Sequence, residues 1–91
     1  MNAAVANLGQ TLALELAPLR VNVVSPGIID TPSRAGMPEA ARSAFYSSTA
    51  AKLPVQRVGT AEDVAETVLY LIHNGFVTGT VLHVEGGHRL I

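Results

Sequence analysis

Apolar residues recur at helical spacing near the start of the chain. They fall at three- and four-residue steps, at Val5, Leu8, Leu12 and Leu16. Alanines fill the intervening positions, so the segment predicts a helix over residues 2–17 that is buried on more than one side. Pro18 is expected to end this helix, because proline disfavours a helical conformation in the residue before it.

Two short apolar segments predict strands. Residues 20–25 contain three valines and stop at a Pro–Gly turn, and residues 80–84 stop at Gly86 and Gly87. A helix that leads directly into an apolar strand is typical of an α/β layer built on a parallel sheet. We therefore expect segments 20–25 and 80–84 to be neighbouring parallel strands.

Between these strands the pattern predicts a loop and a helix. Residues 26–37 are rich in Pro, Gly, Ser and Thr, and we expect a loop there. Residues 38–52 predict a helix. Two interpretations stay open for the apolar side chains of this region: they line a substrate pocket, or they form the core face of an ordinary amphipathic helix. These side chains are Met37, Phe45 and Tyr46.

Residues 61–73 predict the last helix, since apolar residues line one face of the segment. Thr60 is expected to cap its start, with Asp63 three residues later completing a capping box. Asn74 and Gly75 are expected to end it, because both residue types tolerate the left-handed conformation. The stretch LPVQRVG before this helix predicts a linker.

The composition indicates a globular piece with more apolar surface than its size can bury. The 91 residues allow one small domain, and 48% of them are hydrophobic while only 14% are charged. An average domain has roughly 25% charged residues. There is no cysteine, so neither a disulfide framework nor a cysteine-based zinc site is expected. We interpret the chain as part of something larger or as one half of an oligomer.

Charge and hydropathy argue against several classes of partner. The net charge is −1 and the six Lys and Arg are scattered, so no basic surface for nucleic acid or anionic lipid is expected. No apolar run approaches the roughly eighteen residues of a membrane span, and the start lacks the features of a signal peptide. The three histidines form no metal-binding pattern. We expect a cytoplasmic protein without bound metal, membrane or nucleic acid.

Three successive segments resemble the short-chain dehydrogenase/reductases. They read TLALELAPLRVNVVSPGIIDTP, LPVQRVGTAEDVAETVLYLI and VTGTVLHVEGGH, in family order and at family spacing, and span essentially the whole chain. Members of this family are NAD(P)-dependent oxidoreductases of small alcohols or carbonyl compounds, with a doubly wound Rossmann sheet. The resemblance implies an α/β fold and a single partial domain over residues 1–91. This domain would be the C-terminal part of such a parallel sheet, with two parallel strands and three helices.

The resemblance also implies a cofactor role for the turn after the first strand. Ligands of open α/β sheets bind beyond the carboxyl ends of the strands, and in the family this turn meets the nicotinamide. Carried over, Pro26 and Gly27 allow the backbone to approach the ring. The backbone of Ile29 bonds the carboxamide, and the hydroxyl of Thr31 acts there or on the pyrophosphate. The alternative is a plain turn in which Thr31 caps the next segment.

The residues that perform the family's chemistry are expected upstream of this segment. The glycine-rich phosphate loop, the catalytic Ser and the catalytic Tyr have no counterpart here, and Asn2 occupies the position of the catalytic Lys. An Asn carries no positive charge to stabilise a tyrosinate. The chain either begins inside a longer reading frame or belongs to a branch with an altered Tyr–Lys pair. Asn2 as a plain helix N-cap is compatible with both, and no catalytic residue is expected in the chain.

Two functions are therefore open at this point. In the first, the chain is the C-terminal segment of an NAD(P)-dependent oxidoreductase and contributes a nicotinamide-side loop, a substrate lid and a subunit interface. Alone it would not be catalytic and would bind NAD or NADP very weakly. In the second, it is a non-catalytic dimerisation or interaction module derived from the same family. A homo-oligomer is expected, and the module has pairing with a full-length relative as its alternative.

Overall fold

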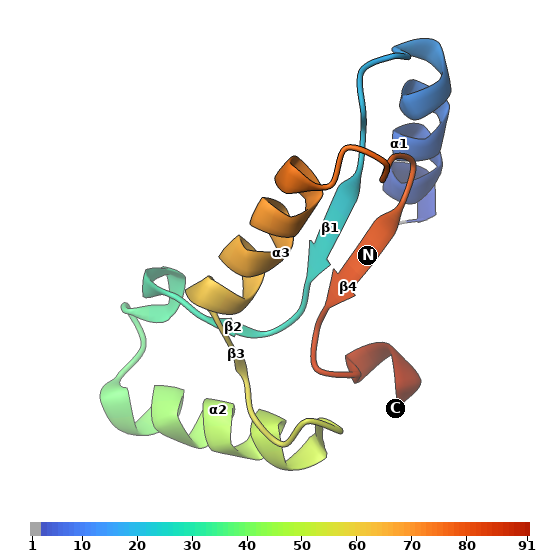
Figure 1. Ribbon diagram of the computed structural model, residues 1–91. Helices are drawn as coiled ribbons and strands as arrows, with labels where there is room; N and C mark the ends of the chain where they lie inside the picture. The colour runs from blue at the N-terminus through green and yellow to red at the C-terminus, as the bar shows by residue number, and fades with distance from the viewer. Residues whose placement is uncertain (1–2) are drawn as a thin grey trace.

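Two pairs of parallel strands organise the part of the chain that the structure describes, residues 3–91 of a computed structural model (Figure 1). The elements in chain order are α1 Ala3–Glu15, β1 Val23–Pro26, β2 Ile29–Asp30, the 3₁₀ turn η1 Pro32–Arg34, α2 Glu39–Lys52, β3 Gly59–Thr60, α3 Ala61–His73, β4 Val81–Val84 and the 3₁₀ turn η2 His88–Leu90. β1 pairs with β4 and β2 pairs with β3, both in parallel. The α/β class and the parallel pairing of the first and last predicted strands are confirmed.

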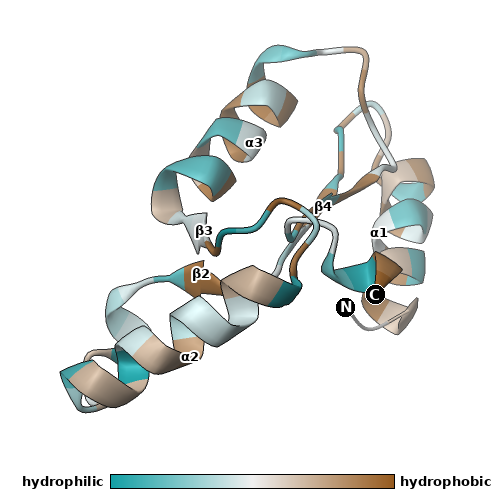
Figure 2. Ribbon diagram, turned by 90° about the horizontal axis from the view of Figure 1, so that it is seen from below, coloured by the Kyte–Doolittle hydropathy of each residue, from teal (hydrophilic) through white to brown (hydrophobic). Residues whose placement is uncertain are grey.

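The β1–β4 pair forms the body of the fold. Val23 lies opposite Val81, and Ser25 lies opposite His83. Helices α1 and α3 lie on different sides of this pair, as in a doubly wound sheet (Figures 1 and 2). Gly9 allows the close approach of α1, because a Cβ added there would lie 2.5 Å from Val23 Cγ2.

The start of α3 is fixed by the predicted capping box. Asp63 N donates to Thr60 Oγ1 (3.2 Å), and Thr60 N donates to the Asp63 carboxylate (2.8 Å). Each side chain thus satisfies a backbone donor that the first turn of a helix leaves without a partner. The helix covers Ala61–His73, the range that its apolar face indicates.

The end of α3 differs from the prediction. Neither Asn74, with φ −91°, nor Gly75 has a positive φ, so the expected left-handed ending is wrong. The guanidinium of Arg20 instead donates to the carbonyls of Leu71 (2.7 Å) and Ile72 (3.0 Å). A cation at the carboxyl end of a helix satisfies free carbonyls and complements the helix dipole.

The first strand starts later than predicted, at Val23 and not at residue 20. The side chains of the preceding residues are used to hold the α3–β4 connection. Asn22 Nδ2 donates to Val77 O (3.0 Å), and Asn22 Oδ1 accepts from Thr80 N (3.1 Å). Residues 20–22 therefore lie outside the sheet, and the Asn22 side chain stabilises the connection between α3 and β4.

The predicted loop over residues 26–37 contains regular structure. It includes β2 and η1, and β2 pairs with β3 at the end of the predicted linker. Ile29 lies opposite Gly59 and Asp30 opposite Thr60. This short pairing joins the cofactor-loop candidate to the first turn of α3.

The other predicted ranges differ by one or two residues from those observed. α1 ends at Glu15 and not at residue 17, and the predicted helix start at Asn2 lies outside the described residues. α2 begins at Glu39, after Pro38 in an extended conformation. β4 begins at Val81.

The described chain buries little of its apolar surface. Its buried hydrophobic residues are Ile29, Leu53 and Leu71. The exposed large hydrophobic residues are Val5, Leu8, Leu14, Leu16, Leu19, Val55, Val68, Leu69, Tyr70, Ile72, Phe76, Leu90 and Ile91. The accessible surface is 6153 Å² for 9.5 kDa, whereas a compact monomer of that mass has roughly 5,000 Å². The radius of gyration is 15.5 Å, against roughly 12 Å for a compact domain of this length.

Candidate functional site

The turn after β1 lies at the carboxyl ends of both strands of the body. Gly27 N donates to Val84 O (2.9 Å), which ties the turn to the end of β4. A Cβ at position 27 would lie 2.8 Å from Glu85 Cβ and 2.9 Å from Glu85 Cα. Glycine is therefore required here by a contact between two segments of the protein itself, before any ligand is considered.

The two isoleucines after this turn are part of the packed structure. Ile29 is buried and Ile28 is half-buried. Gly59 N donates to Ile28 O (3.0 Å), and a Cβ at Gly59 would lie 2.5 Å from Ile29 Cδ1. Ile29 O accepts from Arg34 Nη1 (3.3 Å). Neither of these two hydrogen bonds uses the N–H of Ile29.

Thr31 follows β2 directly and stands at the start of η1. Its hydroxyl lies 2.7 Å from Ser33 Oγ and makes no side-chain capping bond to η1. The alternative prediction, that Thr31 caps the following turn, is confirmed for its position as N-cap of η1, but its side chain makes no capping bond. A hydroxyl has one donor and two acceptor sites, so the bond to Ser33 leaves capacity for a further partner.

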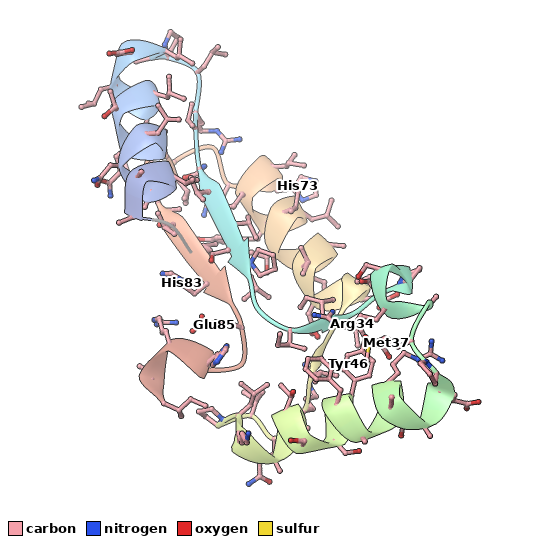
Figure 3. All side chains as sticks on the ribbon, turned by 180° about the vertical axis from the view of Figure 1, so that it is seen from behind. Arg34, Met37, Tyr46, His73, His83 and Glu85 are labelled. Atoms are coloured by element: carbon pink, nitrogen blue, oxygen red, sulfur yellow. The ribbon has the colours of Figure 1, made fainter. Side chains whose placement is uncertain are left out.

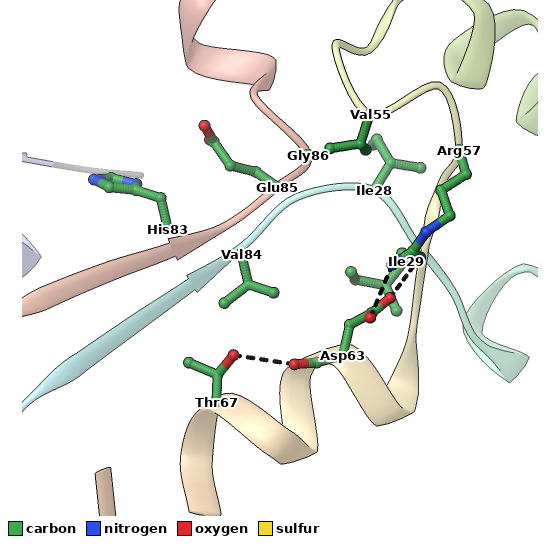
Figure 4. Close-up of a pocket in the computed structure, with 11 residues that line it drawn as sticks. Ile28, Ile29, Val55, Arg57, Asp63, Thr67, His83, Val84, Glu85 and Gly86 are labelled. Atoms are coloured by element: carbon green, nitrogen blue, oxygen red, sulfur yellow. Dashed lines mark hydrogen bonds and ion pairs between the residues drawn. The ribbon is translucent and has the colours of Figure 1, made fainter. Parts of the chain in front are cut away.

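A cavity of about 340 Å³ opens at the strand ends (Figure 4). It is lined by Ile28, Ile29, Val55, Arg57, Gly59, Asp63, Thr67, His83, Val84, Glu85 and Gly86. The lining comes from the turn after β1, the start of α3 and the end of β4. Apolar and charged side chains thus share one wall at the edge where ligands of open α/β sheets bind.

The four predicted cofactor residues do not converge on one cavity. Ile29 lines the cavity at the strand ends, while Thr31 lines another of about 360 Å³ together with residues that include Asp30 and Arg42. Pro26 and Gly27 line neither of these two cavities. All four residues belong to one short segment of the chain, Pro26 to Thr31. Within the described residues, this segment therefore forms one side of a site and not an enclosed pocket.

The carboxylates at the first cavity are held in ion pairs. Arg57 Nη1 lies 2.7 Å from Asp63 Oδ2, and Arg89 Nη1 lies 2.9 Å from Glu85 Oε1. The bond from Arg57, followed by that from the Thr60 backbone, holds the pKa of Asp63 well below its usual range. The backbone N–H of Arg89 lowers the pKa of Glu85. Neither carboxylate is suited to accept a proton as a general base near neutral pH.

No metal centre or membrane span is found in the described part of the chain. Within residues 3–91, no three His, Asp or Glu side chains converge to hold a metal ion. Over the same range, no helix is long and apolar enough to cross a bilayer. His83 lines the first cavity, but within residues 3–91 it belongs to no group of three or more side chains that could hold a metal ion.

Arg34 is the centre of a cluster that the sequence pattern did not reveal. Its Cζ lies 5.1 Å from the centroid of the Phe45 ring and 6.0 Å from that of Tyr46, and the two rings are 5.6 Å apart. Neither ring, nor Met37, lines either of the two cavities described above. None of the α2 residues Glu39–Lys52 is buried, so neither interpretation, substrate pocket or core face of the helix, is decided within this part of the fold. Arg34 and the rings belong to different elements, so no periodicity links them.

Comparison with curated proteins gives relatives that are about three times longer. A family model described as Enoyl-(Acyl carrier protein) reductase matches residues 1–89. The 3-oxoacyl-[acyl-carrier-protein] reductase FabG of Thermotoga maritima is 39% identical over 89 residues, which are 93% of this chain and 35% of that protein. The peroxisomal 2,4-dienoyl-CoA reductase SPS19 of Saccharomyces cerevisiae is 40% identical over 84 residues, 88% of this chain and 28% of that protein. The chain spans about a third of the length of these relatives.

Solved structures show the same arrangement of elements. A small-chain dehydrogenase in complex with NADPH matches with a TM-score of 0.91 and 46% identity, over 99% of this chain and 41% of that one. The ligand-free aldohexose dehydrogenase of Thermoplasma acidophilum matches with a TM-score of 0.83 and 33% identity, over 98% of this chain and 39% of that one. The predicted Rossmann-like class is therefore confirmed, with the chain forming part of such a sheet.

Proposed function

Because the chain belongs to the short-chain dehydrogenase/reductase family, we propose that it is the C-terminal segment of an NAD(P)-dependent oxidoreductase of a small alcohol or carbonyl compound. Its part in that enzyme is the nicotinamide-side loop, a substrate lid and a subunit interface. The observation that carries the proposal is the position of residues 26–31, which run from the last residue of β1 past the carboxyl end of that strand, where ligands of open α/β sheets bind. Similarity to a dehydrogenase in complex with NADPH supports the same assignment.

The loop fits a nicotinamide cofactor, NAD or NADP, in three respects. The N–H of Ile29 takes part neither in the bond from Gly59 N to Ile28 O nor in the bond from Arg34 Nη1 to Ile29 O. This N–H is therefore left as a donor for the carboxamide oxygen. The hydroxyl of Thr31 keeps bonding capacity beside Ser33 for the carboxamide or the pyrophosphate. Gly27, which follows Pro26 at the turn, has no side chain and presents bare backbone beside the ring. These residues bind and orient the ring, and the nicotinamide supplies hydride transfer when bound.

A second candidate function is a non-catalytic interaction module. The observation that favours it is the exposed apolar surface of α1, where Leu8 is 56% and Leu14 is 83% exposed. Exposed apolar surface of this kind marks an interface or an aggregation hazard. In the enzyme proposal the same surface forms the contact of a homo-oligomer, so the two functions differ in catalysis and not in assembly.

The test is to restore the missing part of the fold. Residues 3–91 are joined directly after the catalytic Lys of the Thermotoga maritima reductase, and the reduction of a 3-oxoacyl thioester is followed with NADH and with NADPH. The chimaera should turn over, whereas the 91-residue chain alone should show no activity and bind dinucleotide more weakly than about 1 mM. The matched chimaera with Asn in place of that Lys, as at Asn2, should lose most of the activity. A folded chimaera without turnover would contradict the enzyme proposal and favour the module.

A further inference from the structure

Helix α2 has few attachments to the rest of the protein. It lies away from the β1–β4 body, below the β2–β3 pair (Figure 1), and none of its residues Glu39–Lys52 is buried. The first buried side chain is that of Leu53, just after the helix. The position of α2 therefore depends on a small number of contacts along its length.

One of these contacts joins α2 to the cofactor-loop candidate. The guanidinium of Arg34 lies over the Phe45 and Tyr46 rings, at 5.1 and 6.0 Å, and Nη1 donates to the carbonyl of Ile29 at 3.3 Å. Figure 3 shows Arg34, Met37 and Tyr46 gathered between α2 and the segment that carries β2. A single planar group thus contacts both the helix and the strand.

Only an arginine is suited to both contacts at once. The flat face of a guanidinium stacks on aromatic rings, while its N–H groups donate in the plane of the group. A lysine ammonium can lie near a ring, but it has no flat face to stack and no fork of donors. Through one guanidinium, Arg34 thus makes both the bond to Ile29 and the cation–π contacts with the α2 rings.

We propose that Arg34 is a positioning residue that couples α2 to the backbone of Ile29. The proposal rests on the proposed function, in which Ile29 meets the nicotinamide and α2 belongs to the substrate lid. When α2 moves away, the guanidinium leaves the Ile29 carbonyl or the rings, so the lid and the nicotinamide contact are held in place together. Substrate binding is the step that this coupling controls.

Hydrogen exchange of the 91-residue chain, followed by mass spectrometry of its peptides, tests the coupling without cofactor. Arg34→Met should raise the exchange of α2 amides about three- to tenfold while α3 keeps its wild-type rate. Arg34→Lys should fall between Arg34→Met and wild type. The matched control is Arg42→Met, since Arg42 is half-buried on α2 and its side chain makes no hydrogen bond or ion pair in the described chain. Unchanged exchange in α2, or equal acceleration of α2 and α3, would overturn the proposal.

Kinetics of the chimaera separate positioning from a loss of folded protein. Arg34→Met should raise the KM for the 3-oxoacyl thioester about three- to tenfold with kcat changed less than about twofold, because a loosened lid weakens substrate binding. A smaller folded fraction lowers only the apparent kcat, so an unchanged KM in the active chimaera would overturn the coupling. An inactive chimaera contradicts the proposed function instead, and the exchange comparison then decides whether Arg34 holds α2.

Discussion

Arg57 and Asp63 face each other in a two-pronged ion pair, with Nη1 2.7 Å from Oδ2 and Nη2 3.0 Å from Oδ1. The same carboxylate accepts the backbone N–H of Thr60 at 2.8 Å and its hydroxyl at 3.1 Å. One side chain thus joins the segment before β3 to the first turn of α3, at the wall of the cavity. The ionised carboxylate thus contributes to holding the first turn of α3 beside the strand ends.

Stability should therefore fall in acid, and Asp63 should account for part of the fall. The bond from Arg57 lowers the pKa of Asp63 in the folded state, so its contribution is present above the ordinary carboxyl pKa of about 4 and is lost as the pH falls through the folded value. Thermal unfolding followed by circular dichroism from about pH 6 to pH 2.5 should show a steeper loss of Tm in wild type than in Asp63→Asn.

The matched control for this titration is Glu66→Gln on the same helix. Glu66 is exposed and its side chain makes no hydrogen bond or ion pair in the described structure, so its replacement should leave the wild-type slope. Equal slopes for wild type and Asp63→Asn would show that the ion pair and the cap do not lower the pKa of Asp63 in the folded state relative to the unfolded state.

Gly27→Ala should destabilise the fold although it adds a single methyl group. The new Cβ would lie 2.8 Å from Glu85 Cβ and 2.9 Å from its Cα, so backbone must shift. Overpacking of this kind costs about 1–3 kcal/mol in the free energy of unfolding, measurable by urea denaturation. Gly36→Ala is the control, because no atom lies within 4 Å of the added Cβ. An equal change in both variants would count against the close contact.

Tyr46→Phe should leave the stability unchanged or raise it, by up to about 1 kcal/mol. The Tyr46 hydroxyl is a buried polar atom without a hydrogen-bond partner in the described structure. Its removal relieves the desolvation cost and keeps the ring beneath Arg34. Tyr70→Phe is the control, since Tyr70 is 50% exposed and its hydroxyl is free to bond water. Clear destabilisation by Tyr46→Phe in urea denaturation would mean that the hydroxyl has a partner.

Arg20→Met should destabilise the end of α3 by about 1 kcal/mol. The substitution removes the donors to Leu71 O and Ile72 O together with a bond to Val77 O at 3.2 Å. Arg20→Lys keeps the charge near the helix end but loses the fork, and it should fall between wild type and Arg20→Met in urea denaturation. A Met variant as stable as wild type would show that water replaces the guanidinium at no cost.

The elements that could be predicted from sequence are those with local signals. The Thr60–Asp63 spacing predicts a capping box that the structure contains, and the helix that leads directly into the first apolar strand predicts the parallel pairing. β2 and β3 could not be predicted, because two-residue strands have no alternation and their partners are far apart in sequence. The contacts of Arg20 and Arg34 were missed for a similar reason, since long side chains reach across elements without leaving a period.

The candidate site was predicted through resemblance more than through pattern. The turn at Pro26 and Gly27 lies at the strand ends, where the resemblance places a cofactor, but Gly27 is already required by its contact with Glu85. Ile29 is buried against Gly59. The hydrophobic pattern of the sequence alone did not predict this contact. The roles of these residues and of Thr31 toward a nicotinamide stay predictions, since they depend on the rest of the sheet.

The chain should self-associate through the apolar surface that it leaves uncovered. Leu14 is 83% exposed on α1, and covering even about 600 Å² of such surface favours association by about 15 kcal/mol before entropic costs. Light scattering at tens of micromolar should therefore find dimers or larger species, and Leu14→Lys should lower the mean mass. Leu90→Lys is the control, because Leu90 is 73% exposed but lies near the end of the chain, outside α1. A wild-type chain that stays monomeric and melts cooperatively would show that it needs no partner for its core.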